Sequence, residues 1–190
     1  MNIIMTGSTS FVGAATVREL LRRGHTVTAI VRPKSSKLDT ILEGNEEALL
    51  SGRLLVTEND LSEPEKLLEK VTKPQDVFCH FGWGGSGSAS RTDKALQEKN
   101  MEISLETVRT AEALGCKKFL FSGSQAEYGM HQDLITEDTV CEPKSLYGEA
   151  KLAMREKGEK LCDELGLRYI HARIFSAYGP GDHPWTLVES

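Results

Sequence analysis

Near the N-terminus of this 190-residue chain, a glycine-rich turn lies between an apolar strand and a helix. Residues 2–5 form the expected strand, the turn reads Gly7-x-x-Ser10-x-x-Gly13, and a helical pattern covers 12–23 before a terminal glycine. Such a turn lets the backbone approach a pyrophosphate, while the helix N-terminus supplies N–H donors. Serine replaces the usual middle glycine, but it is small and can cap the helix or reach a phosphate. The motif predicts a dinucleotide site, with an ordinary βα glycine turn as the alternative.

Strands and helices alternate along the rest of the chain. We expect further strands at 26–31, 53–56, 76–81, 118–122 and 168–174, and helices at 38–42, 65–71, 92–114 and 145–165. The run Lys118-Phe-Leu-Phe121 is too apolar for a strand that is buried on one side only. The sequence therefore predicts an α/β fold, a Rossmann-type doubly wound parallel sheet with helices on both faces.

Composition excludes several classes of protein. The net charge of -5 gives no electrostatic reason to expect nucleic acid as a partner. No apolar run approaches the roughly 20 residues that span a bilayer, and no signal peptide precedes the glycine turn. The four cysteines form no CxxC pair, which argues against a metal site and for reduced thiols in the cytoplasm. We expect a cytoplasmic protein with no metal, membrane or nucleic-acid partner.

The residues after the second and third strands indicate which cofactor is bound. An NAD site usually places a carboxylate after the second strand, to accept from the adenosine ribose. Here Arg32 follows Val31, and its guanidinium can hold a ribose 2′-phosphate. We expect NADP(H) to be preferred and NAD(H) to be the alternative, unless Arg32 is only a solvated surface charge. Asp60-Leu61 follows the third strand, where an acid can meet the adenine amino group or, equally, cap the next helix.

A second motif points to proton transfer. Tyr147 and Lys151 stand four residues apart on one expected helix face, although this spacing alone also fits a helix-surface pair. A cation beside a phenol stabilises the phenolate and lowers the phenol's pKa, so that the phenol can act as a base. Ser124 follows the fifth strand at its carboxyl end, where ligands bind in open α/β sheets. Its hydroxyl can hydrogen-bond the substrate oxygen at which Tyr147 acts.

Taken together, these motifs resemble the extended short-chain dehydrogenase/reductases, specifically the NAD(P)-dependent epimerase/dehydratase family that acts on nucleotide sugars. Matching stretches span nearly the whole chain: Thr6 to Gly13, Asp60-Leu61, His80 to Gly82, Asn100, Ser122 to Gly129, Tyr147 to Lys151 and Arg173 to Gly181. The resemblance implies that Ser124, Tyr147 and Lys151 are catalytic. Together with the residue-based reasoning, it gives a cofactor-binding set of Gly7, Thr9, Ser10, Phe11, Val12, Gly13, Arg32, Asp60, Leu61, Phe81, Gly82, Asn100, Ser122, Tyr147, Lys151 and Phe175.

The resemblance also assigns narrower roles. It implies that Asn100 is a structural or proton-relay residue and that the region of Phe175 lies against the nicotinamide. It further implies that the protein is a homodimer joined through its two long helices. The chain departs from the family pattern at Ser10, at Gly82-Trp83 and at Ser176, where asparagine is frequent, and the last departure puts a substrate contact in doubt.

Two residues after Ser124 narrow the reaction. Related 4,6-dehydratases carry an acidic pair there, whereas this chain has Gln125 and Ala126, so we expect no 4,6-dehydratase. An NAD(P)-dependent nucleotide-sugar epimerase, which transfers hydride and proton at sugar C4 through a keto intermediate, is the leading hypothesis. An NADPH-dependent 4-keto-sugar reductase, or another reductase of the extended group, is the alternative. A non-enzymatic NADP(H)-sensing regulator is a third possibility, but such proteins commonly lose the tyrosine or the lysine.

The expected elements also divide the chain. About sixteen residues follow the last strand, too few for a substrate domain. We expect residues 1–175 to form the NAD(P)-binding Rossmann domain with the catalytic residues, and 176–190 to begin a truncated substrate-binding region. The C-terminal substrate domain would then be largely absent, because the natural chain is longer or this one is truncated.

Overall fold

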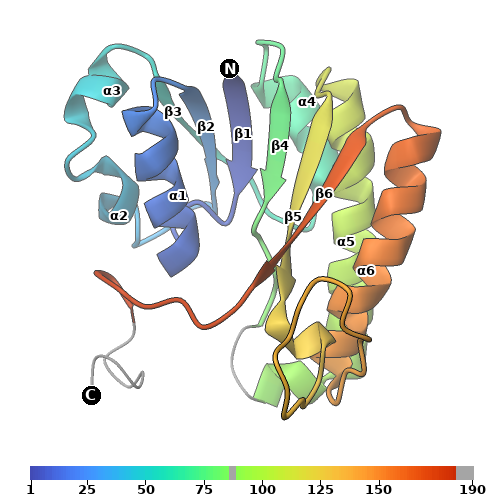
Figure 1. Cartoon of the computed structure of the whole chain (residues 1–190). Coiled ribbons are helices and arrows are strands. Elements are labelled where there is room, and N and C mark those ends of the chain that lie inside the picture. The colour runs from blue at the N-terminus through green and yellow to red at the C-terminus, as the bar shows by residue number, and fades with distance from the viewer. Residues whose placement is uncertain (86–88, 183–190) are drawn as a thin grey trace.

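The computed structural model describes residues 1–85 and 89–182 of the chain. Within them, six parallel strands form one sheet in the order β3-β2-β1-β4-β5-β6 (Figure 1). This order confirms the Rossmann-type prediction. The strand bounds are β1 Asn2–Thr6, β2 Thr26–Val31, β3 Leu54–Glu58, β4 Val77–His80, β5 Lys118–Ser124 and β6 Arg168–Ile174.

Helices cover both faces of the sheet (Figure 1). The α-helices are α1 Phe11–Arg22, α2 Asp39–Leu42, α3 Glu46–Leu50, α4 Leu67–Lys70, α5 Lys94–Ala113 and α6 Leu146–Glu164; the 3₁₀ helices are η1 Pro64–Lys66, η2 Ala89–Thr92 and η3 Gln125–Glu127. Helices α1 to α3 lie on one side, and α4 to α6 on the other. Sequence reasoning missed α3. This helix has only 5 residues, lies in a polar stretch and buries only Ala48. Sequence reasoning also began the long helix too early, because Asp93 caps α5 by accepting from the Leu96 N–H.

The buried face of α5 is more polar than the sequence pattern suggested. Val108 and Ala111 are fully buried, but two other apolar residues of the helix, Leu96 and Ile103, are only half-buried. Ser104 and Thr107 are fully buried instead. Each of these hydroxyls donates to the carbonyl four residues earlier in the helix, at 2.8 Å. Because the hydroxyls are satisfied within the helix, their burial leaves no unpaired donor.

The carboxyl ends of the strands position the site. Strand order reverses between β1 and β4, and in open α/β sheets ligands bind at such a reversal, beyond the carboxyl ends of the strands. After β6 the chain runs along these ends toward α1 (Figure 1), and Gly181 approaches Phe11. Residues 183–190, part of the expected substrate-binding region, lie outside the described residues.

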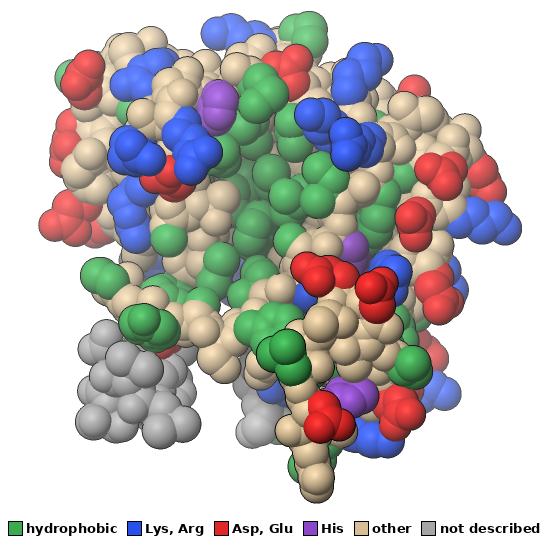
Figure 2. Space-filling model, viewed as in Figure 1, with side chains coloured by type: hydrophobic (Ala, Val, Ile, Leu, Met, Phe, Trp, Pro, Cys, Tyr) green, Lys and Arg blue, Asp and Glu red, His purple; other side chains and the backbone are tan. Residues whose placement is uncertain are grey.

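The sheet face away from α5 and α6 is incompletely covered near its β6 edge. Leu120 and Ile170 point to that face and are only half-buried. Figure 2 shows hydrophobic side chains gathered at the middle of the same view, between charged side chains above and acidic ones below. In the described part of the chain, no helix is long and apolar enough to cross a membrane.

Candidate active site

The glycine turn after β1 folds as the motif predicts. Gly7 has φ +68°, and a Cβ there would lie 2.7 Å from the carbonyl carbon of Phe81. A Cβ at Gly13 would collide with the carbonyl oxygen of Gly7. The Ser10 hydroxyl accepts from the Gly13 N–H at 3.1 Å and donates to the Gly7 carbonyl at 2.7 Å. Serine therefore caps α1 and preserves the turn, as we expected.

A cavity of about 490 Å³ opens beside this turn; we call it the turn cavity. Of the residues expected to bind cofactor, those that line it are Gly7, Thr9, Ser10, Arg32, Leu61, Phe81 and Gly82. Sequence reasoning missed Lys37 and Asn59, which line the same cavity. Lys37 follows the expected strand end by several residues and belongs to no recognisable motif, so only the fold brings it beside Arg32.

Some expected cofactor residues do not line this cavity. Phe11, Val12 and Gly13 lie in the first turn of α1, behind the glycine loop. The Asp60 carboxylate accepts from the N–H and the hydroxyl of Ser62, at 2.9 and 2.6 Å. These two bonds lower the pKa of Asp60 and engage its carboxylate within its own loop. They do not cap the next helix, because the N-cap of η1 is Glu63.

Asn100 does not line the turn cavity but hydrogen-bonds the main chain that forms its wall. Its side chain is buried in α5, where its Oδ1 accepts from the Gly84 N–H at 2.9 Å and its Nδ2 donates to the Gly84 carbonyl at 2.8 Å. Gly84 itself lines the turn cavity. The structure therefore gives Asn100 the structural role that the family resemblance offered as one of two options.

The shape and donors of the turn cavity fit a dinucleotide. The absence of a side chain at Gly7 leaves the backbone of Phe81 and Gly82 free to form its wall. The N-terminus of α1, capped by Ser10, has no acidic residue in its first turn. Backbone N–H groups and the positive end of a helix dipole are the donors that a pyrophosphate requires. The turn residues would hold the phosphates, and Arg32 and Lys37 would face the adenosine end.

A second cavity, of about 610 Å³, contains the expected catalytic residues; we call it the tyrosine cavity. Ser124, Tyr147 and Lys151 line it, as do the predicted cofactor residues Ser122 and Phe175. Ser124 is the last residue of β5, whereas Tyr147 and Lys151 stand one turn apart near the start of α6. Ser10, Phe81 and Trp83 line both cavities, so the two cavities adjoin at these residues.

Lys151 is buried between aromatic rings. Its Nζ donates to the Ser122 carbonyl at 2.8 Å and lies 3.9 Å from the centre of the Trp83 ring and 4.5 Å from that of Phe121. Burial lowers its pKa to about 7, against the opposing charge of Glu127. The ammonium is thus held by one carbonyl and two ring faces, without a direct carboxylate partner among the described residues.

Tyr147 meets a second cation that sequence reasoning missed. Burial raises the pKa of its phenol, and a side-chain hydrogen bond with Ser124 and the charge of Arg91 oppose that shift. The Arg91 guanidinium carbon lies 5.0 Å from the centre of the Tyr147 ring. We had assigned the stabilising charge to Lys151, whose Nζ is 5.7 Å from the same centre. Arg91 lies on η2, which no sequence pattern indicated.

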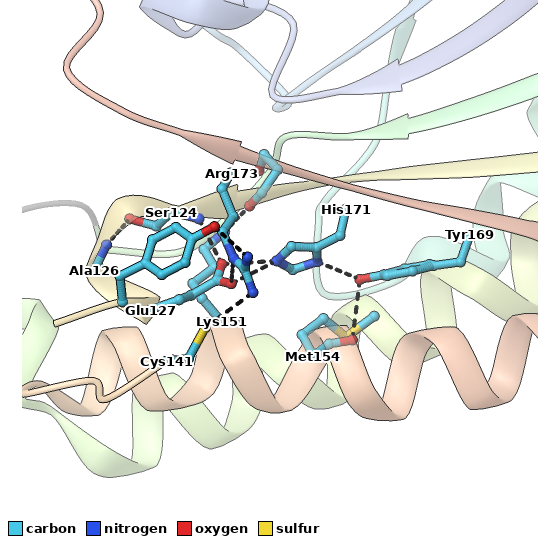
Figure 3. A network of polar contacts seen from close by, with 11 residues as sticks. Ser124, Ala126, Glu127, Cys141, Lys151, Met154, Tyr169, His171 and Arg173 are labelled. Carbon is cyan, nitrogen blue, oxygen red and sulfur yellow. Dashed lines mark hydrogen bonds and ion pairs between the residues drawn. The ribbon is translucent and has the colours of Figure 1, made fainter. Parts of the chain in front are cut away.

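A buried polar network lies beneath Ser124 (Figure 3). The Glu127 carboxylate accepts from the Ser124 N–H at 2.7 Å, from Arg173 Nε at 2.7 Å and from His171 Nε2 at 2.9 Å. Sequence reasoning gave Glu127 no role. The Ser-x-x-Glu spacing from Ser124 to Glu127 is typical of a capping box, and this pattern could have indicated the contact between them.

Comparison with known proteins identifies the family of the chain. The NAD dependent epimerase/dehydratase family matches residues 3–189. The chain is 30% identical over 178 residues to D-erythronate dehydrogenase of Cupriavidus necator, which covers 92% of this chain and 53% of that protein. It is 28% identical over 185 residues to UDP-glucose 4-epimerase of Lactobacillus helveticus, which covers 94% and 52%.

Solved structures agree with the family match. The UDP-glucose 4-epimerase of Thermotoga maritima, solved with UDP-glucose, superposes with a TM-score of 0.80 at 26% identity and covers 98% of this chain and 59% of its own. The chain thus spans about half the length of the curated relatives it matches. Because the family match extends over almost all of its residues, the chain belongs to the NAD-dependent epimerase/dehydratase family.

Proposed function

We propose that this chain is the cofactor-binding, catalytic part of an enzyme that oxidises and reduces a nucleotide sugar at C4, with 4-epimerisation through a keto intermediate as the leading activity. The observation that carries the proposal is that Ser124, Tyr147 and Lys151 line one cavity, which adjoins the turn cavity. The family to which the chain belongs includes UDP-glucose 4-epimerases among its relatives.

Each side chain would have a distinct role. A bound NAD(P) cofactor would accept hydride from the sugar carbon and return it. Tyr147 would remove the proton from the C4 hydroxyl during oxidation and donate it during reduction. Ser124 lines the same cavity as Tyr147 and would bind the same sugar oxygen. Lys151 would hold ribose hydroxyls, and Arg91 would stabilise the phenolate.

The same cavity argues against dehydration. Gln125 and Ala126 line the tyrosine cavity, and neither can transfer a proton. Glu127, the nearest carboxylate in sequence, is fully buried beneath Ser124 and does not line the cavity. Elimination of water needs an acid and a base at the sugar beside the tyrosine, so we propose that the enzyme is not a 4,6-dehydratase.

The turn cavity supports a second candidate. Arg32 and Lys37 both line it, whereas a carboxylate for the ribose 2′-hydroxyl is absent from its lining in the described residues. Two cations favour a 2′-phosphate, so we propose that NADP(H) is preferred over NAD(H). An exchangeable NADPH would suit a 4-keto-sugar reductase, and the relative D-erythronate dehydrogenase shows that redox enzymes occur among the similar proteins.

The organisation of the whole protein also belongs to the proposal. We propose that residues 1–175 form the cofactor domain and that 176–190 lead into a substrate-binding region. We further propose a cytoplasmic homodimer that pairs through α5 and α6, with a nucleotide sugar as its small-molecule ligand. Met101 and Leu105 of α5 pack against the core but are only half-buried, and the apolar surface that they leave uncovered supports such pairing.

The test is a substrate screen with the full-length protein. UDP-, dTDP-, GDP- and CDP-sugars are incubated with NADPH, NADP⁺, NADH or NAD⁺, and products are separated by chromatography. Epimerase activity would give a C4 epimer without net change in cofactor absorbance, while reductase activity would consume NADPH with a 4-keto sugar. No turnover of any nucleotide sugar, with turnover of a different class of alcohol or ketone, would contradict the proposal.

A further inference from the structure

Glu127 is a buried carboxylate that the proposed chemistry does not use. Its side chain has no exposed surface, and it lies on η3, directly after β5. Burying a charge is costly, and a buried ion pair often stabilises a fold no better than well-packed apolar residues do. The position of Glu127 under Ser124 therefore needs an explanation other than stability.

In residues 1–85 and 89–182, three groups form hydrogen bonds to this carboxylate (Figure 3). Oε1 accepts from the Ser124 N–H at 2.7 Å, and Oε2 accepts from Arg173 Nε at 2.7 Å. His171 Nε2 lies 2.9 Å from both oxygens, so this ring nitrogen must carry a proton. Burial raises the pKa of Glu127, but the bonds from His171, Arg173 and Ser124 outweigh it, so that the pKa is lowered and the carboxylate is ionised at neutral pH.

The partners of Glu127 are themselves fixed. Arg173 donates from Nη1 to the Tyr128 hydroxyl at 2.7 Å and from Nη2 to Cys141 Sγ at 3.2 Å. Nδ1 of His171 lies 3.0 Å from the Tyr169 hydroxyl. The network thus ties η3 to the edge strand β6, and the carboxylate has little freedom to move.

Gly123 makes room for this arrangement. A Cβ at this position would collide with His171 Nε2 and lie 2.7 Å from Glu127 Oε1. Gly123 immediately precedes Ser124 in β5, and both residues line the tyrosine cavity. The strand therefore lacks a side chain at the one place where the carboxylate and the imidazole meet its backbone.

Ser124 connects the network to the reacting centre. Its N–H donates to Glu127, its hydroxyl accepts from the Ala126 N–H at 3.2 Å, and the residue lines the tyrosine cavity together with Tyr147. The reciprocal bonds between Ser124 and the η3 turn form a capping box. Movement of the Glu127 carboxylate would therefore move the serine main chain, and with it the hydroxyl at Tyr147.

We propose that Glu127 is a positioning residue for the reaction: held by Arg173 and His171, it fixes the main chain of Ser124 and so keeps the serine hydroxyl against Tyr147. This inference rests on the proposed function. It adds a role for three buried side chains that do not touch the substrate. Its consequence is that a change at Glu127 lowers the rate of the chemical step, not the binding of cofactor or substrate.

The first test is Glu127→Gln in the full-length enzyme, on whichever nucleotide sugar it turns over. Glutamine has the same shape, but one of the two carboxylate oxygens is replaced by an NH₂ group, which cannot accept a hydrogen bond. That NH₂ would face another donor, either Arg173 or the N–H groups of Ser124 and His171. We expect kcat to fall by about 10- to 100-fold, the loss typical of a small misplacement at a reacting centre, with KM and cofactor Kd unchanged. Val108→Ala, a fully buried change in α5, is the control that loses stability without loss of kcat.

A double-mutant cycle shows whether the effect passes through Ser124. Glu127→Gln should cost little further activity in a Ser124→Ala background, because the group being positioned is already gone. An equal loss of kcat in both backgrounds, or an unchanged kcat per folded molecule, would overturn the proposal.

A second pair of variants covers the case in which Glu127→Gln does not fold. His171→Gln keeps an N–H donor for the carboxylate, whereas His171→Leu removes it in a side chain of similar size. We expect kcat to be largely kept in the first and reduced in the second, with KM unchanged in both. Equal kcat values for the two variants would contradict the positioning role.

Hydrogen exchange separates this proposal from the proposed function. In Glu127→Gln the Ser124 amide should exchange faster, while the ladder amides of Phe119 and Phe121 in the same strand keep their protection. If the wild-type enzyme turns over no nucleotide sugar, the proposed function fails and the positioning claim is decided by exchange. Unchanged exchange at Ser124 would refute it.

Discussion

Replacing Gly7 by alanine tests whether the glycine turn is shaped for a ligand or is an ordinary βα connection. Gly7 and Gly24 both have positive φ, +68° and +80°, so alanine is strained at either position. At Gly24 a Cβ would meet nothing within 4 Å, whereas at Gly7 it would lie 2.7 Å from the Phe81 carbonyl carbon and 2.8 Å from the Gly82 nitrogen. Gly24→Ala is therefore the matched control, because it carries the backbone strain without the contact.

The two positions should differ in both stability and binding. Left-handed strain costs about 1–2 kcal/mol for an alanine, which predicts a fall in Tm of a few °C for Gly24→Ala. Gly7→Ala adds backbone overpacking of about 1–3 kcal/mol, so its Tm should fall roughly twice as far. Because the turn and Phe81 line the turn cavity, the same variant should weaken cofactor binding at least about tenfold, equivalent to about 1.4 kcal/mol.

Thermal unfolding and titration calorimetry with NADPH and NADH measure these effects. Gly24→Ala should bind both cofactors as the wild-type chain does. If Gly7→Ala matched Gly24→Ala in Tm and in cofactor Kd, the close approach of the turn to Phe81 and Gly82 would have no role in binding, and the assignment of the cavity would be wrong.

Three further predictions follow from charges in the site. Arg32→Ala should raise the Kd of NADPH by roughly 10-fold or more while leaving that of NADH unchanged, as measured by calorimetry; an equal effect on both would remove the case for a 2′-phosphate. In the folded chain the pKa of Lys151 is about 7, whereas the ordinary pKa of a lysine is 10.5. Between these two pH values the unfolded chain therefore binds more protons than the folded chain. Burial of the ammonium thus destabilises the fold most below about pH 7. Lys151→Met should therefore raise Tm more at about pH 6 than at about pH 10, and a pH-independent change would contradict this. The pKa of Glu127 is lowered from 4.5, so its contribution to stability is complete above that value and is lost as pH falls through the folded-state pKa. In Glu127→Gln, Tm should therefore fall less steeply than in the wild-type chain as the pH is lowered below about pH 5. The same dependence of Tm on pH in both proteins would count against an ionised carboxylate.

Local patterns predicted the fold, and most of the site residues that they indicated line the turn cavity or the tyrosine cavity. The glycine turn, the strand ends and the Tyr147–Lys151 spacing are short-range features, and the parallel sheet brings their carboxyl ends together by necessity. Ser10 capped α1 as expected because the interaction is confined to three residues. The strands β2 and β6 have the bounds that were predicted from their β-branched and apolar residues.

The residues that sequence reasoning missed act over long separations. Arg91 reaches Tyr147 from another part of the chain, and Arg173 reaches Glu127 from the neighbouring strand β6. A charged residue in a sequence gives no sign of the partner that will desolvate it, and a histidine such as His171 is ordinary until the strand pairing is known. The polar buried face of α5 was missed because the hydroxyls of Ser104 and Thr107 are satisfied within their own helix.

The central claim is that Tyr147 transfers the proton in a cofactor-dependent reaction. Tyr147→Phe removes only the phenolic oxygen from the tyrosine cavity and leaves the turn cavity untouched. Single-turnover measurement with the full-length enzyme, its nucleotide sugar and cofactor should show a rate reduced by about 100-fold or more, with cofactor Kd unchanged. A Tyr147→Phe variant that retains the wild-type rate would contradict the account.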